Sequence, residues 1–264
     1  PDYRKAYGYL GLAHERLGEY QAARGAFRKA GADHLAARMA RFVEPDLLDV
    51  EGQMIRAKRV IIATGSRPFV PEAYTAFGDR VITTDDFFEQ ESLPGSLAVI
   101  GMGVIGLELG QALARMGVEV TGVDMAEGIG GITDPEVGRV AIDVIGKEFP
   151  LWLGAAAEVT EEPDGRLRVS AGENTVVVEK ILMAIGRVPN TDRLGLEALG
   201  VEKDSRGVPV HDRHTMQIGD LPIFIAGDVT GERPLLHEAG DEGRIAGLNA
   251  VSDSVTRFRR KVPL

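Results

Sequence analysis

The sequence predicts an α/β fold with a parallel sheet at its centre. Residues 97–124 read as strand, glycine-rich turn, helix and second strand, which is one unit of a doubly wound sheet. Two further apolar runs, 59–64 and 223–229, have the length of buried parallel strands. Gly65 follows the first run, and Gly227 lies within the second. Residues 3–31 instead carry apolar side chains at helical spacing, which predicts a helical hairpin ahead of the sheet.

The turn after the first strand of this unit has the pattern G-x-G-x-x-G. The apolar run Leu97–Ile100 leads into it, and its glycines are Gly101, Gly103 and Gly106. The first permits a tight turn, the second lets the backbone approach a pyrophosphate, and the third lets the helix pack closely on the sheet. Because strand, turn, helix and second strand follow in the required order, the pattern predicts a dinucleotide site. The alternative is a Rossmann-like unit without a ligand.

The helix after this turn begins at about Val104. The N–H groups of Val104 and Ile105 have no intrahelical acceptor, and the positive end of the helix dipole adds to the attraction for phosphate. The second strand, Glu119–Val123, is followed by Asp124, where an acid accepts hydrogen bonds from the adenine ribose hydroxyls. A carboxylate repels the extra phosphate of NADP, so Asp124 favours NAD.

Composition excludes several classes of function. The chain has 264 residues, 44% of them hydrophobic, a net charge of −10 and no cysteine. This length suffices for a sizeable core or two small domains, and the negative charge argues against nucleic-acid binding. Without cysteine there is no disulfide, thiolate metal site or redox dithiol. No run approaches the roughly 18 apolar residues of a membrane span, and no signal peptide is visible, so we expect no membrane contact and a cytoplasmic location.

Residues 3–31 resemble one tetratricopeptide repeat. The residues that carry the resemblance form the pattern L-G-x-A-x-x-x-L-G-x-Y-x-x-A-x-x-x-F-x-K-A over residues 10–30. Members of that family bind peptides through arrays, whereas one repeat cannot bury its own apolar face and roughly three are needed. We therefore interpret residues 1–40 as a packing or capping hairpin, with a further helix over Asp33–Phe42.

The remaining elements follow from periodicity and turn residues. Phe42–Ile55 reads as a β-hairpin that turns at Glu51–Gly52. Its predicted core positions are Val50, Met54 and Ile55. Further strands are expected at 156–160, 167–171, 175–179 and 180–185, and further helices at 85–91, 135–148 and 238–251.

Two of these helices have clear start signals. Thr84 is the expected N-cap of the first, and Asp134 with Pro135 at the first helical position begins the second. In the last helix, Gly240, Gly243 and Gly247 are expected to allow close packing.

Histidines and acids outside the glycine turn predict no metal site. His211 and His214 are three residues apart in a loop, and the sequence offers no evident third ligand. No local motif supports a Ser/His/Asp arrangement. We therefore expect no resident metal and no catalytic residue of these kinds.

Several long motifs, in order, resemble the dihydrolipoamide dehydrogenase branch of the pyridine nucleotide–disulfide oxidoreductases. The resemblance covers residues 40–264. It is carried by ATGSRP at 63–68, GMGVIGLELG at 101–110, AIGRVPNTDRLGLEALGV at 184–201, GVPV at 207–210, IFIAGDV at 223–229 and LLHEAGDEGRIAG at 235–247.

The resemblance implies an FAD-binding domain split around an inserted NAD-binding domain. The implied bounds are 41–92 and 188–251 for the partial FAD-binding domain, 93–187 for the NAD-binding domain, and 252–264 for the start of a dimerisation domain. The positions that match FAD contacts are Thr64, Gly65, Asp228, Leu236 and His237. The positions that match NAD contacts, beyond the glycine turn and Asp124, are Glu108 and Gly186 on the nicotinamide side.

The chain departs from that family at two points. The family's own FAD fingerprint and its C-x-x-x-x-C redox disulfide have no counterpart in this sequence. His237 does not match the family's acid–base histidine, which belongs to the dimerisation domain. The resemblance therefore leaves room for a partner chain that supplies the other part of the flavin site, and the oligomeric state stays open.

Two functions from different classes remain. In the first, the chain is the NAD(H)-binding portion of a flavin-dependent oxidoreductase, in which hydride passes between NAD(H) and FAD. In the second, it is a non-catalytic NAD-binding or protein-interaction module beside a tetratricopeptide-like hairpin. The absent cysteines and flavin fingerprint favour the second for the chain alone, and the resemblance favours the first.

Overall fold

A computed structural model describes residues 39–259. The predicted hairpin of residues 3–31, and residues 33–38 of the helix expected after it, lie outside the described residues. Within the described part, one compact unit comprises the residues up to Lys58 with Leu194–Gly200, and the other comprises Arg59–Arg193 with the residues from Val201 onward. These two units are defined by contacts within the chain and not by cofactor binding. The bounds expected for the FAD-binding and NAD-binding domains therefore remain a prediction.

The first unit is a three-stranded antiparallel sheet with the order β1-β2-β3. Its strands are β1 (Ala40–Glu44), β2 (Leu47–Val50) and β3 (Gln53–Arg56), and a short 3-10 helix, η2 (Leu196–Leu199), belongs to the same unit. The sequence predicts only the turn at Glu51–Gly52. A second turn at Pro45–Asp46 converts the expected hairpin into three strands.

Three predictions for this unit are wrong. Residues 40–42 form a strand and not the end of a helix, because they pair with residues 48–50 of β2. Phe42 also donates its backbone N–H to the carbonyl oxygen of Leu194 at 2.7 Å. Val50 is buried as expected, but Met54 is 58% exposed and Ile55 is 40% exposed. All four residues of β3, the strand that carries them, are exposed, so this strand contributes no side chain to the core.

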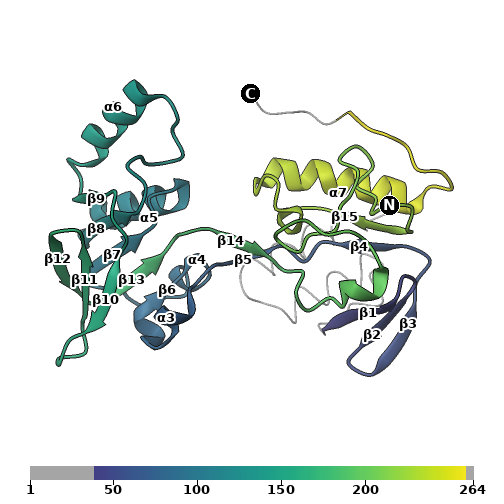
Figure 1. The fold of residues 1–264 in the computed structure, drawn as a ribbon, viewed down its shortest axis with the longest axis horizontal. Coiled ribbons are helices and arrows are strands. Elements are labelled where there is room, and N and C mark those ends of the chain that lie inside the picture. The colour runs from purple at the N-terminus through teal and green to yellow at the C-terminus, as the bar shows by residue number, and fades with distance from the viewer. Residues whose placement is uncertain (1–38, 260–264) are drawn as a thin grey trace, which may run out of the picture. The chain divides into compact units, whose positions relative to one another are not determined.

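The second unit contains a five-stranded, all-parallel sheet with the order β6-β13-β7-β8-β9 (Figure 1). Its strands are β6 (Val81–Ile82), β13 (Lys180–Met183), β7 (Ser96–Ile100), β8 (Glu119–Asp124) and β9 (Leu151–Leu153). The two edge strands are only two and three residues long and were not predicted. The chain places later strands on both sides of β7, which makes the carboxyl end of β7 a topological switch point.

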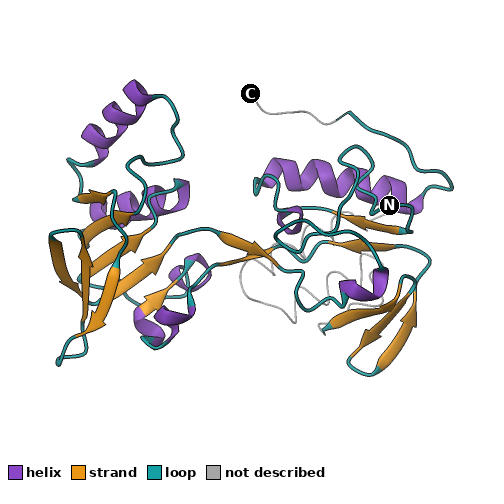
Figure 2. Ribbon diagram, viewed as in Figure 1, coloured by secondary structure: helices purple, strands orange, loops and turns teal. Residues whose placement is uncertain are grey.

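Both faces of this sheet are covered, as apolar parallel strands require (Figure 2). Leu97 and Val99 point into a core shared with α5 (Val104–Arg115) and α6 (Pro135–Ile145). Ala98 and Ile100 point to the opposite face. That face packs on an antiparallel sheet made of β10 (Glu158–Glu161), β11 (Leu167–Ala171) and β12 (Asn174–Val178). The alternation along one strand therefore builds both cores.

A separate pair of parallel strands lies outside the five-stranded sheet. Strand β4 (Val60–Ile62) pairs with β15 (Ile223–Ile225), and α7 (Leu236–Val251) contacts both. The core of this region contains Met216, Phe224, Ala226, Ile245 and Ala246. The antiparallel pair β5 (Ser66–Pro68) and β14 (Arg187–Pro189) connects this part of the chain to the five-stranded sheet.

Short helices complete the unit. They are α3 (Glu72–Thr75), η1 (Gly78–Arg80), α4 (Thr84–Phe87) and η3 (Asp228–Thr230). Helix α4 is shorter than predicted, and its N-cap is Thr83 and not Thr84. Thr83 accepts a hydrogen bond from the Asp85 N–H, and the Asp86 carboxylate accepts from the Thr83 N–H, which is a capping box.

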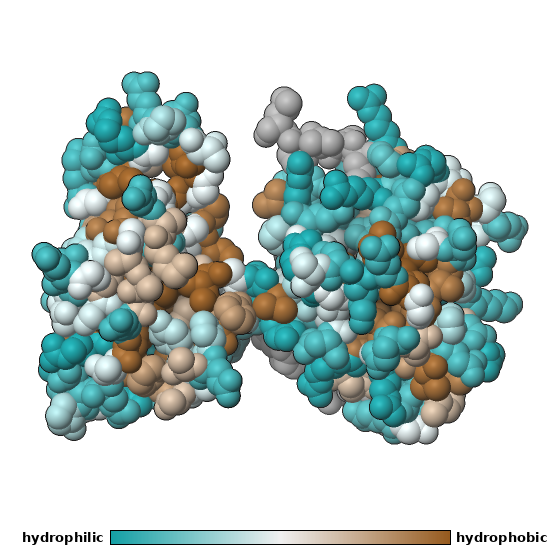
Figure 3. Space-filling model, in the orientation of Figure 1, coloured by the Kyte–Doolittle hydropathy of each residue, from teal (hydrophilic) through white to brown (hydrophobic). Residues whose placement is uncertain are grey.

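Asp134 caps α6 as predicted, because its carboxylate accepts from the N–H groups of Glu136 and Val137. The predicted close packing of Gly240, Gly243 and Gly247 is wrong: an ideal Cβ at each would meet no atom within 4 Å. Apolar side chains interrupt a largely hydrophilic surface (Figure 3). The most exposed lie at the two ends of α7, where Leu236 and Val251 are each 84% exposed. No helix in residues 39–259 has the length and apolar character needed to cross a membrane.

Candidate functional site: two edges of parallel strands

The glycine turn after β7 is tight where the sequence predicts it. Gly101 has φ +101°, and a Cβ there would lie 2.5 Å from the carbonyl oxygen of Ala184. A Cβ on Gly106 would lie 1.8 Å from the carbonyl oxygen of Gly101. The tight turn and the close helix packing are therefore confirmed. Gly103 is different, because a Cβ there meets no atom within 4 Å, which leaves space in front of the turn.

Helix α5 begins directly at this space. Its N-cap is Gly103, which has no side chain to accept from the first-turn amides, and the Gly103 carbonyl accepts from Leu107 at 3.0 Å. The first N–H groups of any α-helix have no acceptor within the helix. The positive end of the helix dipole and these N–H groups, including those of Val104 and Ile105, are suited to an anion.

Asp124 ends β8 beside the turn and has a contact that the sequence did not reveal. Its Oδ2 accepts from the Met102 N–H at 2.6 Å, and its Oδ1 accepts from the Ala126 N–H at 2.8 Å. The Met102 carbonyl in turn accepts from the Gly130 N–H at 2.7 Å. The acid therefore holds the glycine turn in place, while each carboxylate oxygen keeps a lone pair for a further donor.

The carboxyl end of β13 lies beside the same turn. The Ala184 N–H donates to the Ile100 carbonyl at 2.8 Å, which brings the segment ending in Gly186 next to the glycine turn. Gly186 has φ +122° and is exposed, and a Cβ there would meet no atom within 4 Å. Glu108 lies in the second turn of α5 and is also exposed. Both are accessible, and contact with a nicotinamide remains a prediction for both.

A second edge is formed where β4 and β15 end. The Ala226 N–H donates to the Ile62 carbonyl at 3.0 Å, so the residues after both strands lie at one edge. Thr64 donates its hydroxyl to the Asn190 carbonyl at 2.8 Å. Gly65 has φ +66°, and its carbonyl accepts from the Asn190 N–H at 3.0 Å. Asn190 therefore holds the Thr64–Gly65 turn, a role that the sequence alone did not show.

Asp228 follows β15 at this edge. The preceding Gly227 has φ +81°, and its N–H donates to the buried Glu242 carboxylate at 2.8 Å. The Ser66 hydroxyl donates to Asp228 Oδ2 at 3.4 Å. Leu236 and His237 begin α7, and both are exposed. The structure thus brings Thr64, Gly65 and Asp228 to one edge.

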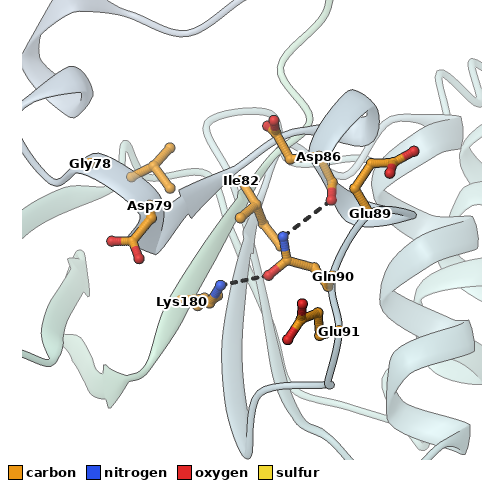
Figure 4. A pocket seen from close by; sticks show the side chains of 9 residues that line it. Gly78, Asp79, Ile82, Asp86, Glu89, Gln90, Glu91 and Lys180 are labelled. Carbon is orange, nitrogen blue, oxygen red and sulfur yellow. Dashed lines mark hydrogen bonds between the residues drawn. The ribbon is translucent and has the colours of Figure 1, made fainter.

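A pocket of about 470 Å³ is lined by none of the residues that form the two edges, and Figure 4 shows its lining side chains. Lys180 lines it at the amino end of β13 and donates to the Gln90 side chain at 2.6 Å. The other charged side chains that line it are the carboxylates of Asp79, Asp86, Glu89 and Glu91. Their negative charge opposes a pyrophosphate, so this pocket is not suited to a dinucleotide.

The two loop histidines have other partners. His211 donates Nδ1–H to the Pro209 carbonyl at 3.0 Å, and His214 donates Nδ1–H to the Phe258 carbonyl at 3.0 Å. Within residues 39–259 no group of three or more His, Cys, Asp or Glu side chains has the geometry of a metal site.

Comparison with known proteins identifies the lineage of this arrangement. Residues 16–243 match the family model described as pyridine nucleotide-disulphide oxidoreductase. The chain belongs to this family. The match begins inside the segment that resembles a tetratricopeptide repeat, and it leaves that resemblance untested.

Curated relatives give a finer comparison. The chain is 32% identical over 252 residues to dihydrolipoyl dehydrogenase 2 of Haloarcula marismortui, covering 89% of this chain and 52% of the relative. It is 36% identical over 216 residues to dihydrolipoyl dehydrogenase of Staphylococcus aureus, covering 78% of this chain and 46% of the relative. The chain thus spans about half the length of these relatives and is similar to dihydrolipoyl dehydrogenases over that part.

Solved structures confirm the predicted α/β, Rossmann-like fold. The flavoprotein disulfide reductase RclA of Escherichia coli has a TM-score of 0.79 at 22% identity, covering 100% of this chain and 64% of that chain. LpdA of Mycobacterium tuberculosis has a TM-score of 0.76 at 27% identity, covering 95% of this chain and 58% of that chain.

Proposed function

We propose that this chain is the NAD(H)-binding portion of a flavin-dependent oxidoreductase, with its dinucleotide site at Gly101–Gly106. The observation that carries the proposal is the contrast among the three glycines of the turn. Gly101 and Gly106 sit where a side chain would collide with backbone, whereas Gly103 faces open space. That space at a helix N-terminus fits a pyrophosphate.

Each residue of the turn has a distinct task in this proposal. NADH, when bound, supplies a hydride. The N–H groups of Val104 and Ile105 donate to phosphate oxygens. Asp124 accepts from ribose hydroxyls through lone pairs that Met102 and Ala126 do not use. Its charge disfavours the additional phosphate of NADP.

The β4–β15 edge is proposed to contact FAD through Thr64, Gly65, Asp228, Leu236 and His237. Asp228 fits a ligand rich in hydroxyl groups, because an ionised carboxylate accepts about four hydrogen bonds. The Ser66 hydroxyl uses one of these positions. The rest of a flavin site would come from residues outside 39–259 or from a partner chain.

The chain alone is not expected to oxidise dihydrolipoamide. That reaction needs a thiolate to exchange with the substrate dithiol and a disulfide to hold the electrons beside the flavin. The sequence contains no cysteine. This observation favours a second candidate function, a nucleotide-binding or protein-interaction module without disulfide chemistry.

Two measurements on the purified chain separate the candidates. Flavin absorbance together with NADH binding supports the oxidoreductase component, and NADH binding without flavin supports the nucleotide-binding module. Absence of NADH binding would overturn the oxidoreductase component and the nucleotide-binding module, and would leave only the protein-interaction module. Turnover of dihydrolipoamide by the pure chain would overturn the expectation drawn from its cysteine-free composition.

A further inference from the structure

The Arg187 side chain joins the start of β5 to the start of α4. Arg187 is the first residue of β14 and directly follows Gly186. Its Nε donates to the Ser66 hydroxyl at 2.8 Å, and its Nη2 donates to the Ser66 carbonyl at 2.7 Å. Its Nη1 donates to the Thr84 hydroxyl at 3.0 Å and lies 3.5 Å from Asp85 Oδ1. The guanidinium is held from both sides, and the Arg187 side chain is only 23% exposed.

These bonds fix the direction of the Ser66 hydroxyl. A guanidinium can only donate hydrogen bonds, whereas a hydroxyl has one proton and two lone pairs. Ser66 Oγ therefore accepts from Arg187 and directs its own proton to Asp228 Oδ2, 3.4 Å away. The result is an oriented chain from a cation through a hydroxyl to a carboxylate. The Arg187–Ser66 bonds, at 2.8 and 2.7 Å, are charge-assisted and strong, whereas the 3.4 Å contact between Ser66 and Asp228 is the long link of the chain.

We propose that Arg187 is a positioning residue that orients the Asp228 carboxylate through Ser66. The inference rests on the proposed contact between Asp228 and the hydroxyl groups of a flavin. Arg187 acts at a distance, because it holds Ser66, and Ser66 holds one oxygen of the acid. The remaining lone pairs of Asp228 then have a fixed direction before a ligand binds. Such preorganisation lowers the cost of ordering the site.

The identity of the cation matters in this arrangement. The planar guanidinium reaches the Ser66 hydroxyl, the Ser66 carbonyl and Thr84 at once, and a lysine ammonium cannot reproduce that fork. Every printed contact of the guanidinium lies with Ser66, Thr84 or Asp85, so its positioning role concerns the Asp228 side alone.

The test titrates FAD into the full chain and follows flavin fluorescence. We expect Ser66→Ala and Arg187→Met each to weaken FAD binding about fivefold, the effect of one modest hydrogen bond, because the link to Asp228 is long. The double variant should bind FAD no more weakly than the single variant with the lower FAD affinity, because both changes act through Asp228. Ser66→Thr keeps the hydroxyl and should restore FAD affinity to within about twofold.

Two controls separate positioning from general damage. Arg139 is 67% exposed and pairs with Asp143 on α6, so Arg139→Met should leave FAD affinity unchanged. NADH affinity, measured by calorimetry, should stay unchanged in the Ser66 and Arg187 variants. Additive losses in the double variant, or a Ser66→Thr variant as weak as Ser66→Ala, would overturn the positioning role.

A second readout does not depend on flavin. Hydrogen exchange of the Arg187 Nε–H, followed by nitrogen-15 NMR, should become faster in Ser66→Ala and also in Asp228→Ala. Faster exchange in both variants supports the chain even if the parent protein binds no FAD, in which case only the proposed flavin contact fails. An unchanged exchange rate in Asp228→Ala overturns the positioning role even if FAD binds.

Discussion

The glycine turn after β7 and the edge of β4 and β15 are both made where parallel strands end, yet they are assembled in different ways. The turn is built from a continuous stretch of sequence, with Asp124 holding the Met102 N–H. The second edge takes residues from three separate segments, around Ser66, Arg187 and Asp228. Because the first edge lies within one stretch of sequence, its motif can be recognised from the sequence alone. The second edge depends on the pairing of β5 with β14, which are far apart in the sequence.

Glycines in the two long helices show the same contrast. In α5, a Cβ on Gly106 would collide with Gly101, and one on Gly110 would lie 3.2 Å from the Phe149 ring. In α7, Cβ atoms on Gly240 and Gly243 would meet nothing within 4 Å. Glycines at helical spacing therefore indicate close packing only where another element lies against that face of the helix, as β7 lies against α5.

The largest expected effect on stability tests this contrast between the glycines of α5 and α7. Gly106→Ala should lower the free energy of unfolding by about 3 kcal/mol, because the Cβ has no room and the neighbouring group is backbone. Gly243→Ala should instead raise it by about 0.5–1 kcal/mol, because alanine restricts the unfolded chain and meets no atom in α7. Urea unfolding followed by circular dichroism measures both. Equal destabilisation by the two changes would contradict the contrast.

Gly103→Val should remove ligand binding while the fold survives. The branched side chain would fill the space in front of the turn, and we expect NADH affinity to fall at least about 100-fold. The cost to stability should stay below about 1 kcal/mol, since the position is an N-cap with open surroundings. Calorimetry and thermal melting separate the two quantities. A large fall in stability with binding retained would show that the space is not the ligand site.

Asp124→Ala tests whether one acid serves both the turn and the ribose. NADH affinity should fall about tenfold and the preference over NADPH should shrink. Stability should fall by about 1–3 kcal/mol, because the N–H groups of Met102 and Ala126 lose their acceptor. Asp124→Asn keeps one acceptor oxygen and should lose less stability. A stability unchanged in Asp124→Ala would show that the hydrogen bonds to the turn contribute nothing.

The smallest effect concerns pH at the second edge. The hydrogen bonds from Arg67 hold the pKa of the Asp192 carboxyl below its usual range. A lowered folded pKa gives stability that is present above the unfolded pKa of about 3.9 and is lost as the pH falls through the folded pKa. Asp192 is 55% exposed, so solvent screens the pair and the contribution stays below about 0.5 kcal/mol.

Acid unfolding of the parent chain and of Arg67→Met measures the contribution of the Arg67–Asp192 pair to stability. The difference in the free energy of unfolding between the two proteins should vanish at the acid end of the titration. A difference that grows as the pH falls would reverse the assigned sign.

The sequence predicted the parts of the fold in which local pattern and tertiary contact agree. Strand, turn, helix and strand over residues 97–124 are confirmed, as is the Asp134 cap of α6. Strands β6 and β9 were missed because two or three residues carry no period. Met54 and Ile55 were predicted to lie in a core because apolar character does not show whether another element covers the strand.

The candidate sites follow the same division. The tight turn at Gly101 and the close packing at Gly106 could be predicted from spacing, since both follow from backbone geometry, and the pyrophosphate contact at Gly103 stays a prediction. The contacts of Arg187, Ser66 and Asn190 could not, because they depend on β5 pairing with β14. Only the family resemblance marked Thr64, Gly65 and Asp228 in advance.

Isothermal calorimetry of NADH and NADPH with the parent chain and with Gly103→Val tests the central claim most directly. The proposed site predicts saturable binding of NADH to the parent, weaker binding of NADPH, and no measurable NADH binding to a folded Gly103→Val variant. Absence of NADH binding to the parent, or equal binding of NADH to both proteins, would contradict a dinucleotide site at Gly101–Gly106.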